Sequence, residues 1–309
     1  MTKYLILGGS GFIGGNLARS LVNKGHKPRI FTRSSSSLNN INDILDSTEV
    51  VYGDFMDDFA IRKAIQGVDI VFHLISTTFP NTTRESNVYD ISSNLIPTIR
   101  LIELCLTNNV KKVVYASSGG TIYGEPKDIP ITESHPLNPT SMYGQSKLTI
   151  ENYLNFYARS TNLDVNILRI SNPFGAGQKL LGVQGIISVA MGCVCYDRTI
   201  KIYGKGEAIR DYIYIDDVIN ALILASQKTG SSIINISSST GHSIMEVIEA
   251  IEEVTQINIK REFIPPRDGD VKVNILCNKL ASKIYNWQPK IDFKEGLSMT
   301  WQHIRDNFI

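Results

Sequence analysis

Short apolar runs alternate with amphipathic stretches along the chain, most regularly in its first half. Leu95, Ile99, Ile102 and Leu106 recur at helical spacing and predict the buried stripe of one helix. The alternation of strands and helices predicts an α/β fold with a parallel sheet. The β-branched and apolar runs that predict its strands are Tyr4–Leu7, Arg29–Thr32, Val50–Tyr52, Ile70–Leu74, Val113–Ser117, Val165–Ile170 and Ile233–Ile236.

The second half of the chain shows helix starts and a change in composition. Asp216-Asp217 and the capping box Ser243…Glu246 each predict the first turn of a helix. Glycines become dense between Asn172 and residue 206, which predicts a smaller mixed α/β lobe made of non-contiguous pieces. We therefore expect a nucleotide-binding domain from residues 1–171 plus about 211–240, and a substrate-binding lobe from about 172–210 plus 241–309.

The first predicted strand runs directly into Gly9-Ser10-Gly11-Phe12-Ile13-Gly14, which satisfies G-x-G-x-x-G. A predicted helix, Asn16–Val22, follows it. Glycines at these positions allow a tight turn and a close approach of the backbone to a pyrophosphate, whose charge then lies on the helix N-terminus. The sequence therefore predicts a doubly wound Rossmann sheet that binds a dinucleotide.

The residues that would read the adenosine half of that dinucleotide leave NAD and NADP both open. An acidic residue is expected at the end of the second strand, but the sequence there is Phe31-Thr32-Arg33-Ser34. Arg33 with the following serines can accept a 2′-phosphate, which favours NADP, or the guanidinium can stack on the adenine of NAD. Asp54 is placed to hydrogen-bond the adenine amino group, to cap the next helix, or both.

Tyr143 and Lys147 stand at i and i+4 on a predicted helix, so they share one face. Removing a hydride from a sugar carbon requires a base for the hydroxyl proton, and a free phenol with a pKa of about 10 is a poor one. A neighbouring ammonium favours the phenolate, and a serine hydroxyl can bridge it to the sugar oxygen. We assign Tyr143 as base and acid, Lys147 as its electrostatic partner and ribose ligand, and Ser118 as the orienting donor.

Charge and composition exclude several other classes of protein. The 31 Lys and Arg nearly cancel the 30 Asp and Glu, so no overall field exists to hold nucleic acid or an anionic membrane surface. No apolar run approaches the roughly 18 residues that span a bilayer, and the first residues show no cleavage site. We expect a cytoplasmic protein without a metal site, whose four cysteines are reduced packing residues.

These motifs resemble those of the extended short-chain dehydrogenase/reductases, and within them the UDP-galactose 4-epimerase branch. The resemblance runs nearly end to end, and its segments are Gly8–Gly14, Gly53-Asp54, His73-Leu74, Ser117–Gly124, Tyr143–Lys147, Leu168–Pro173, Arg210–Asp217 and Arg267–Asp270. It implies a homodimer that contacts through the helices at Leu95–Leu106 and Tyr143–Tyr157. It also implies cofactor contacts from Gly8, Gly11, Phe12, Ile13, Gly14, Arg33, Asp54, Phe55, Leu74, Ser117, Tyr143 and Lys147.

On the substrate side the resemblance implies that Asn172 contacts the sugar diphosphate and that Tyr203 packs near the uracil. Arg210 and Arg267 would clamp the pyrophosphate, since a guanidinium binds phosphate oxygens in bidentate fashion. Interdomain salt bridges to Asp211, Asp268 or Asp270 are an equally good use of these two arginines.

Two departures from the family pattern bear on the reaction. The loop from Ser118 to Tyr123 is one residue longer than in the best-known 4-epimerases, so Thr121 is a second candidate for the catalytic hydroxyl. Asn274 occupies the position at which those enzymes close the sugar pocket with a large aromatic residue. A smaller residue there admits an N-acetyl group. Ser118, Tyr143 and Asn274 are therefore the residues expected to contact the sugar.

The remaining alternatives concern the type of reaction. Related dehydratases and decarboxylases carry an acidic residue before Val-Tyr-Gly in the active-site loop, where this chain has Gly120, Thr121 and Ile122. Epimerases acting at C3 or C5 need a further acid and base in that loop. We expect a 4-epimerase for UDP-Glc/UDP-Gal or UDP-GlcNAc/UDP-GalNAc with a retained nicotinamide cofactor, serving polysaccharide precursor synthesis. An NADPH-dependent 4-ketosugar reductase and a non-catalytic nucleotide-binding protein are the alternatives.

Overall fold

The computed structural model describes residues 2–79, 87–266 and 270–308. Its centre is a seven-stranded sheet in which every neighbouring pair is parallel. The spatial order is β10 (Ser232–Ile236), β6 (Asp164–Ile170), β5 (Lys112–Ser118), β4 (Ile70–His73), β1 (Tyr4–Leu7), β2 (Arg29–Thr32) and β3 (Glu49–Tyr52). Each strand predicted from the sequence is present. The strand order reverses at β1, because β2 and β3 follow it on one side and β4, β5, β6 and β10 lie on the other. The predicted doubly wound Rossmann sheet is confirmed.

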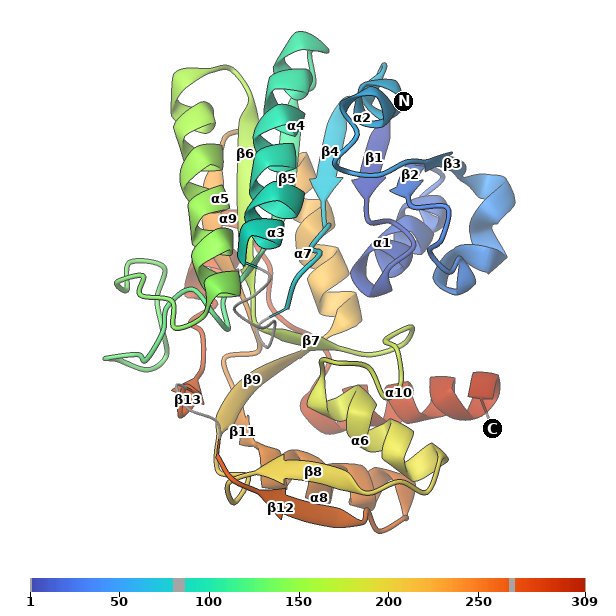
Figure 1. The fold of residues 1–309 in the computed structure, drawn as a ribbon, viewed down its shortest axis with the longest axis vertical. Coiled ribbons are helices and arrows are strands. Elements are labelled where there is room, and N and C mark those ends of the chain that lie inside the picture. The colour runs from blue at the N-terminus through green and yellow to red at the C-terminus, as the bar shows by residue number, and fades with distance from the viewer. Residues whose placement is uncertain (1, 80–86, 267–269, 309) are drawn as a thin grey trace.

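Helices cover both faces of this sheet, each over its own apolar core (Figure 1). Within β1, Ile6 faces the core that holds α1 (Phe12–Asn23) and α7 (Ile215–Gln227). Leu5 and Leu7 face the core that holds α2 (Asp58–Ile65), α4 (Ile96–Thr107) and α5 (Met142–Ser160). Because successive side chains of a strand point to opposite faces, a continuous apolar run fills both cores.

Two irregular helical segments complete this part of the fold. The 3₁₀ helix η1 (Asn39–Ser47) follows β2, and α3 (Asn87–Asp90) continues through a π-helical turn, η3 (Ile91–Leu95), into α4. Leu95, Ile102 and Leu106 of the predicted stripe pack into the core beneath α4. No helix within the described ranges is both long enough and apolar enough to cross a membrane.

A smaller group of elements lies beyond the carboxyl ends of the strands (Figure 1). In it β9 (Ile209–Tyr214) pairs with β7 (Asn172–Phe174), β11 (Gly241–Ser243) and β13 (Val273–Asn274). A second pair joins β8 (Ile200–Tyr203) to β12 (Arg261–Ile264). The helices there are α6 (Ile186–Cys195), α8 (Ile244–Thr255) and α10 (Phe293–Phe308).

The predicted capping box at the start of α8 is present, with the Ser243 hydroxyl and the Glu246 carboxylate each accepting from the other's backbone N–H. One late helix, α9 (Lys279–Tyr285), packs against β10 of the large sheet through a hydrogen bond between Tyr285 and Ser232. The two-part division of the chain at the predicted boundaries stays a prediction.

Candidate active site

The glycine loop lies at the carboxyl end of β1, where the strand order reverses. Helix α1 begins at Phe12, and its N-cap, Gly11, provides no side-chain cap. The N–H groups of its first turn, from Phe12 to Gly14, are therefore available to an anion at the positive end of the helix. A Cβ added at Gly14 would lie 2.3 Å from the Gly8 carbonyl oxygen, so only glycine lets this helix start so close to the loop. This geometry fits a dinucleotide pyrophosphate.

The second strand is fastened to the glycine loop near the predicted adenosine end. The hydroxyls of Ser10 and Thr32 lie 2.6 Å apart, which fixes the loop beside the exposed Arg33. Leu74 follows β4 on the other side of β1, where its backbone N–H donates to Leu7 at 3.1 Å. The predicted cofactor residues of three strand ends thus meet at one edge of the sheet.

The role of Asp54 as a helix cap is corrected by the structure. The Asp54 carboxylate accepts from the Met56 N–H at 2.8 Å within a turn, whereas Asp57 is the N-cap of α2 and accepts from Phe59. The turn places two residues, Phe55 and Met56, between Asp54 and the cap. Asp54 is exposed, and its role at the adenine stays a prediction, while Phe55 is buried in the core.

Tyr143 and Lys147 lie in the first two turns of α5, as their spacing predicts. The Ser141 hydroxyl caps this helix by accepting from the Gly144 N–H at 3.1 Å. The Lys147 Nζ donates to the Ala116 carbonyl oxygen at 3.1 Å and lies 5.8 Å from the centre of the Tyr143 ring. Helix α5 therefore places the phenol and the ammonium together at the end of β5.

Burial dominates the electrostatics of this pair. Burial raises the pKa of Tyr143 to about 12, and hydrogen bonds with Ser76 and Ser118 oppose that shift. Burial also lowers the pKa of Lys147 to about 8, against the attraction of the Asp90 and Glu151 carboxylates. Without a further positive charge Tyr143 holds its proton at neutral pH, and Lys147 loses its own only above about pH 8.

Three hydroxyls of the loop after β5 have different surroundings. Ser118 lies near enough to Tyr143 to lower the pKa of the phenol, while the Ser117 hydroxyl donates to the buried Glu151 carboxylate. The Thr121 hydroxyl is buried and has no hydrogen-bond partner among the described residues. Of the two candidates for the catalytic hydroxyl, Ser118 is the one that contacts the phenol.

A buried ion pair between β6 and α5 anchors this loop. Arg169 on β6 and Glu151 on α5 are 4% and 2% exposed at the side chain and lie 2.7 Å apart. Arg169 also donates to the Tyr123 hydroxyl at 2.9 Å, which itself donates to Asn235 on β10. Because each charge has several partners, the network can fix the loop without leaving a charge unpaired.

The predicted substrate residues gather around β9, with one outside the described residues. The Asn172 amide donates to the Asp211 carbonyl oxygen at 2.8 Å, and Arg210 pairs with Asp270 at 2.6 Å. Asp211 itself accepts from Ser171, Ser238, Ser239 and Leu276. Arg267 and Asp268 lie outside the described residues. Tyr203 is 41% exposed at the end of β8.

Asn274 is only 1% exposed, and its amide donates to the Gly119 carbonyl oxygen at 3.3 Å. Its Oδ1 is buried with no partner among the described residues. The side chain is therefore tied to the active-site loop.

Ser76 is a candidate site residue that the sequence analysis missed. It follows β4 in the polar run Ser76-Thr77-Thr78, and its hydroxyl lowers the pKa of the catalytic candidate Tyr143. A run of hydroxyls just past the end of a central strand was the available signal, because ligands of such sheets bind at the carboxyl ends of the strands.

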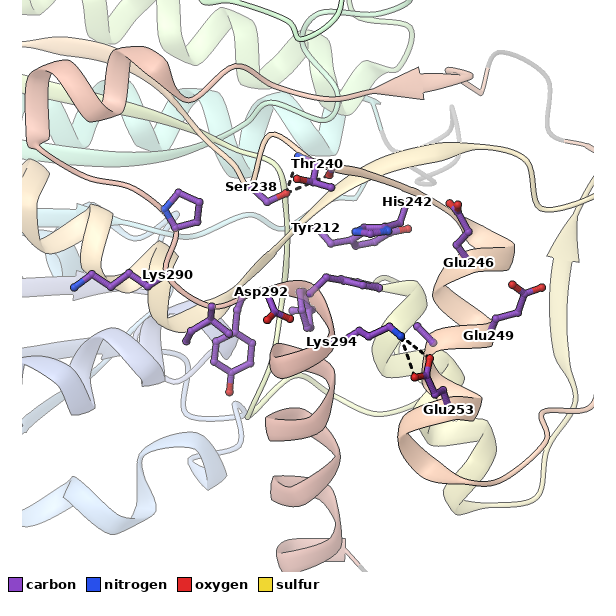
Figure 2. A pocket seen from close by; sticks show the side chains of 16 residues that line it. Tyr212, Ser238, Thr240, His242, Glu246, Glu249, Glu253, Lys290, Asp292 and Lys294 are labelled. Carbon is purple, nitrogen blue, oxygen red and sulfur yellow. Dashed lines mark hydrogen bonds and ion pairs between the residues drawn. The ribbon is translucent and has the colours of Figure 1, made fainter.

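A cavity of about 630 Å³ lies elsewhere, between β9, α8 and the start of α10 (Figure 2). Figure 2 shows Lys294 reaching Glu253, a pair 2.7 Å apart at its rim. His242 stacks on Phe293 in its wall with ring centres 4.1 Å apart. The described residues that line it include none of the predicted catalytic, cofactor or substrate residues, so it is distinct from the site at Tyr143.

Comparison with known proteins identifies the class of enzyme. Residues 4–237 match the NAD dependent epimerase/dehydratase family. The chain is 32% identical over 309 residues to the UDP-glucose 4-epimerase of Mycolicibacterium smegmatis, covering 98% of this chain and 99% of that one. The chain therefore belongs to the NAD-dependent epimerase/dehydratase family, in the extended short-chain dehydrogenase/reductase branch that contains the UDP-glucose 4-epimerases.

Two solved structures extend this likeness to the whole fold. A UDP-glucose 4-epimerase of Thermotoga maritima, solved with UDP-glucose, superposes with a TM-score of 0.94 at 29% identity and covers 100% of both chains. A UDP-N-acetylglucosamine 4-epimerase of Methanobrevibacter ruminantium M1, in complex with UDP-N-acetylmuramic acid, has a TM-score of 0.93 at 27% identity and covers 99% of each. The protein is an NAD-dependent nucleotide-sugar epimerase, a class these comparisons favour over a reductase or a non-catalytic binder.

Proposed function

We propose that the protein interconverts UDP-hexoses that differ in configuration at C4, through a transient 4-keto sugar. The observation that carries this proposal is the placement of Tyr143 and Lys147 on one face of α5, with Ser118 beside the phenol at the end of β5. The dinucleotide loop lies along the same edge of the sheet. The relatives with this whole fold include 4-epimerases of UDP-glucose and of UDP-N-acetylglucosamine.

In this reaction Tyr143 accepts the proton of the C4 hydroxyl and later returns it. Lys147 stabilises the phenolate by its charge, and Ser118 hydrogen-bonds the sugar oxygen and orients it toward Tyr143. Bound NAD supplies the hydride acceptor and donor at C4, and its positive nicotinamide ring favours the phenolate. Because the proton and the hydride both return to the same sugar, no second substrate is needed.

The substrate is held by its UDP part and selected at its hexose. Arg210 lies on β9 of the smaller lobe, and Arg267 would bind the pyrophosphate together with it. Asn172 would contact the diphosphate, and Tyr203 would pack near the uracil. Arg210 would have to exchange its ion pair with Asp270 for phosphate oxygens. Asn274, held back by Gly119, leaves room for an N-acetyl group, so both UDP-GlcNAc and UDP-Glc are proposed substrates.

We propose that the glycine loop, Asp54 and the ends of β2 and β4 hold this NAD. The exposed Arg33 lies just past the end of β2, where its guanidinium would stack on the adenine. The cofactor residues and the two-part division of the chain, with residues 1–171 and 211–240 forming the nucleotide-binding domain, belong to this proposal.

We further propose a homodimer that forms through α4 and α5. The outer face of α5 exposes Tyr153 at 42% and Phe156 at 56%, and Ile96 at the start of α4 is 41% exposed. Apolar side chains gathered in this way on two adjacent helices are typical of a helical interface. The four free cysteines fit a reducing compartment, so we place the enzyme in the cytoplasm, where it would supply precursors of a polysaccharide.

The function is tested by incubating the purified protein, without added cofactor, with UDP-Glc and separately with UDP-GlcNAc. Proton NMR of the anomeric signals should show the C4 epimer appear with at least one of the sugars. No conversion, together with oxidation of NADPH by a 4-keto sugar, would assign the protein as the reductase.

A further inference from the structure

A buried carboxylate lies beside the catalytic candidates without belonging to them. Asp90 is the last residue of α3 and is only 4% exposed. Its Oδ1 accepts hydrogen bonds from two neutral donors, the Thr78 hydroxyl and the Asn94 amide, each at 2.6 Å. A charge taken out of water is unfavourable unless it is well paired, so a buried carboxylate with neutral donors indicates a role beyond packing.

Asp90 and Asn94 together fasten the loop that follows β4. They stand at i and i+4 on the helical segment that runs through η3, so they share one face. The Asn94 Oδ1 accepts from the Thr77 N–H at 3.0 Å, and its Nδ2 donates to the Thr77 hydroxyl at 2.7 Å. Ser93 adds a contact of 2.6 Å to the same hydroxyl. Thr77 and Thr78 are thus held to one helix.

The fastened loop brings Ser76 to the phenol of Tyr143. The Ser76 hydroxyl donates to the Thr78 carbonyl oxygen at 3.1 Å and lies near enough to Tyr143 to lower the pKa of the phenol. A hydroxyl has one proton to donate, so Ser76 can give it to Thr78 or to a phenolate, but not to both. A chain of contacts therefore leads from Asp90 through Thr78 and Ser76 to the proposed base.

The charge of Asp90 also acts on Lys147, in competition with the groups around it. Burial is the largest effect and lowers the pKa of Lys147 to about 8, while Asp90 opposes it more strongly than Glu151 does. Tyr143 and Glu151 face the ammonium from α5, and Tyr115 faces it from β5, with Nζ 4.8 Å from the ring centre. The buried, neutral His73 faces it from β4. The charge of Asp90 raises the pKa of Tyr143, Tyr115 and Lys147 alike.

We propose that Asp90 is a positioning residue of the active site, which holds the Ser76–Thr78 loop beside Tyr143 and places a buried carboxylate near Lys147. It acts through other residues and does not contact the reacting atoms. The proposal rests on the proposed function because it takes Tyr143 as the base. The effect of Asp90 on Lys147, in contrast, can be measured without any turnover.

The test replaces Asp90 by asparagine, which keeps the shape of the side chain and removes its charge. The Lys147 ¹³Cε resonance, assigned by its loss in Lys147→Arg, is titrated in the protein without substrate. We expect its midpoint to move to lower pH in Asp90→Asn, and kcat at neutral pH to fall about tenfold. The exposed Asp46 provides the matched control, since Asp46→Asn removes a remote charge and should leave both unchanged.

A second variant separates the loop from the charge. Thr78→Val removes the hydroxyl that binds Asp90 and keeps the carboxylate, so it should lower kcat without moving the Lys147 midpoint. An unchanged midpoint in Asp90→Asn, or wild-type kcat in Thr78→Val, would overturn the proposal. If Asp90→Asn does not fold, Thr78→Val still decides whether the contact between Asp90 and the loop positions the active site. An inactive wild type would refute the proposed function, and the midpoint would still decide the effect of Asp90 on Lys147.

Discussion

Lys147 is tied to the strand that carries the active-site loop, because its Nζ donates to the Ala116 carbonyl oxygen at 3.1 Å, two residues before Ser118. This contact holds the ammonium at a fixed distance from Tyr143. Since burial lowers the pKa of Lys147 to about 8, the ammonium is present at neutral pH and lost in mildly alkaline solution. The charge that stabilises the phenolate is therefore sensitive to pH.

The first prediction concerns this alkaline range. The kcat/KM of the wild type should decline above about pH 8, as Lys147 loses its proton. Lys147→Arg keeps a positive charge at every accessible pH, so its weaker activity should lack that decline. A pH–rate profile of both proteins checks the prediction. The same alkaline decline in the arginine variant would show that another group is responsible.

Removing the phenolic oxygen should separate catalysis from binding. Tyr143→Phe loses the base but retains the ring and the helix, so turnover should fall by at least about a thousandfold. Affinity for the UDP-sugar, measured by calorimetry, should change little, because the proposed diphosphate contacts, such as Arg210, lie away from Tyr143 on the proposed smaller lobe. Residual turnover within tenfold of the wild type would exclude Tyr143 as the proton acceptor.

Arg210 should matter for substrate binding rather than for stability. Its ion pair with Asp270 is 2.6 Å long with the arginine side chain 17% exposed, which places the guanidinium at the edge of the proposed diphosphate site. Arg210→Gln should raise the Kd for UDP about tenfold to a hundredfold, the effect of one charge-assisted contact.

Arg100→Gln is the matched control for Arg210, because it breaks an exposed pair with Asp58 at 3.2 Å on the outer face of α4. It should leave the Kd for UDP unchanged. Equal effects of the two substitutions would mean that Arg210 serves only its structural ion pair.

The buried His73 should make folding sensitive to acid. Its Nε2 lies 2.8 Å from the Thr98 hydroxyl, which donates its own proton to Asn94, so the imidazole is the donor to Thr98. Burial lowers the pKa of His73 in the folded protein to about 3, below its ordinary value of 6.5. As the pH falls below 6.5 only the unfolded chain gains this proton, so stability is lost from there down to about pH 3.

Urea unfolding at several pH values tests this effect of His73. Its share of the loss is about 1.4 kcal/mol per pH unit within that window. His73→Asn should be less stable at neutral pH but should show a flatter dependence on pH. His135→Asn, which removes a partly exposed imidazole, should keep the wild-type slope. An unchanged slope in His73→Asn would contradict the assignment.

Much of this fold can be predicted from local patterns of the sequence. The strands of the central sheet are buried on both faces, so each appears as an unbroken apolar run, such as Tyr4–Leu7. The glycine loop and the spacing of Tyr143 and Lys147 are equally local, since both depend on one turn or one helix. Such features are predicted because residues near in sequence decide them.

The features that the sequence did not predict depend on contacts between distant segments. Thr78 meets Asp90 across a change of element, and no periodicity marks either residue. The assignment of a helix cap to Asp54 was wrong because a short turn intervenes before Asp57, and either aspartate suits a cap. Asn274 reaches Gly119 only through the pairing of β13 with β9.

The central claim is that the hydride removed from C4 returns to the same carbon. The most direct test is to incubate the wild-type enzyme, without added cofactor, with UDP-hexose deuterated at C4 in ordinary water. We predict that the epimer forms with its deuterium retained at C4, because the hydride never exchanges with solvent. An epimer that carries hydrogen from water at C4 would contradict the account, since it would require removal of that hydrogen as a proton.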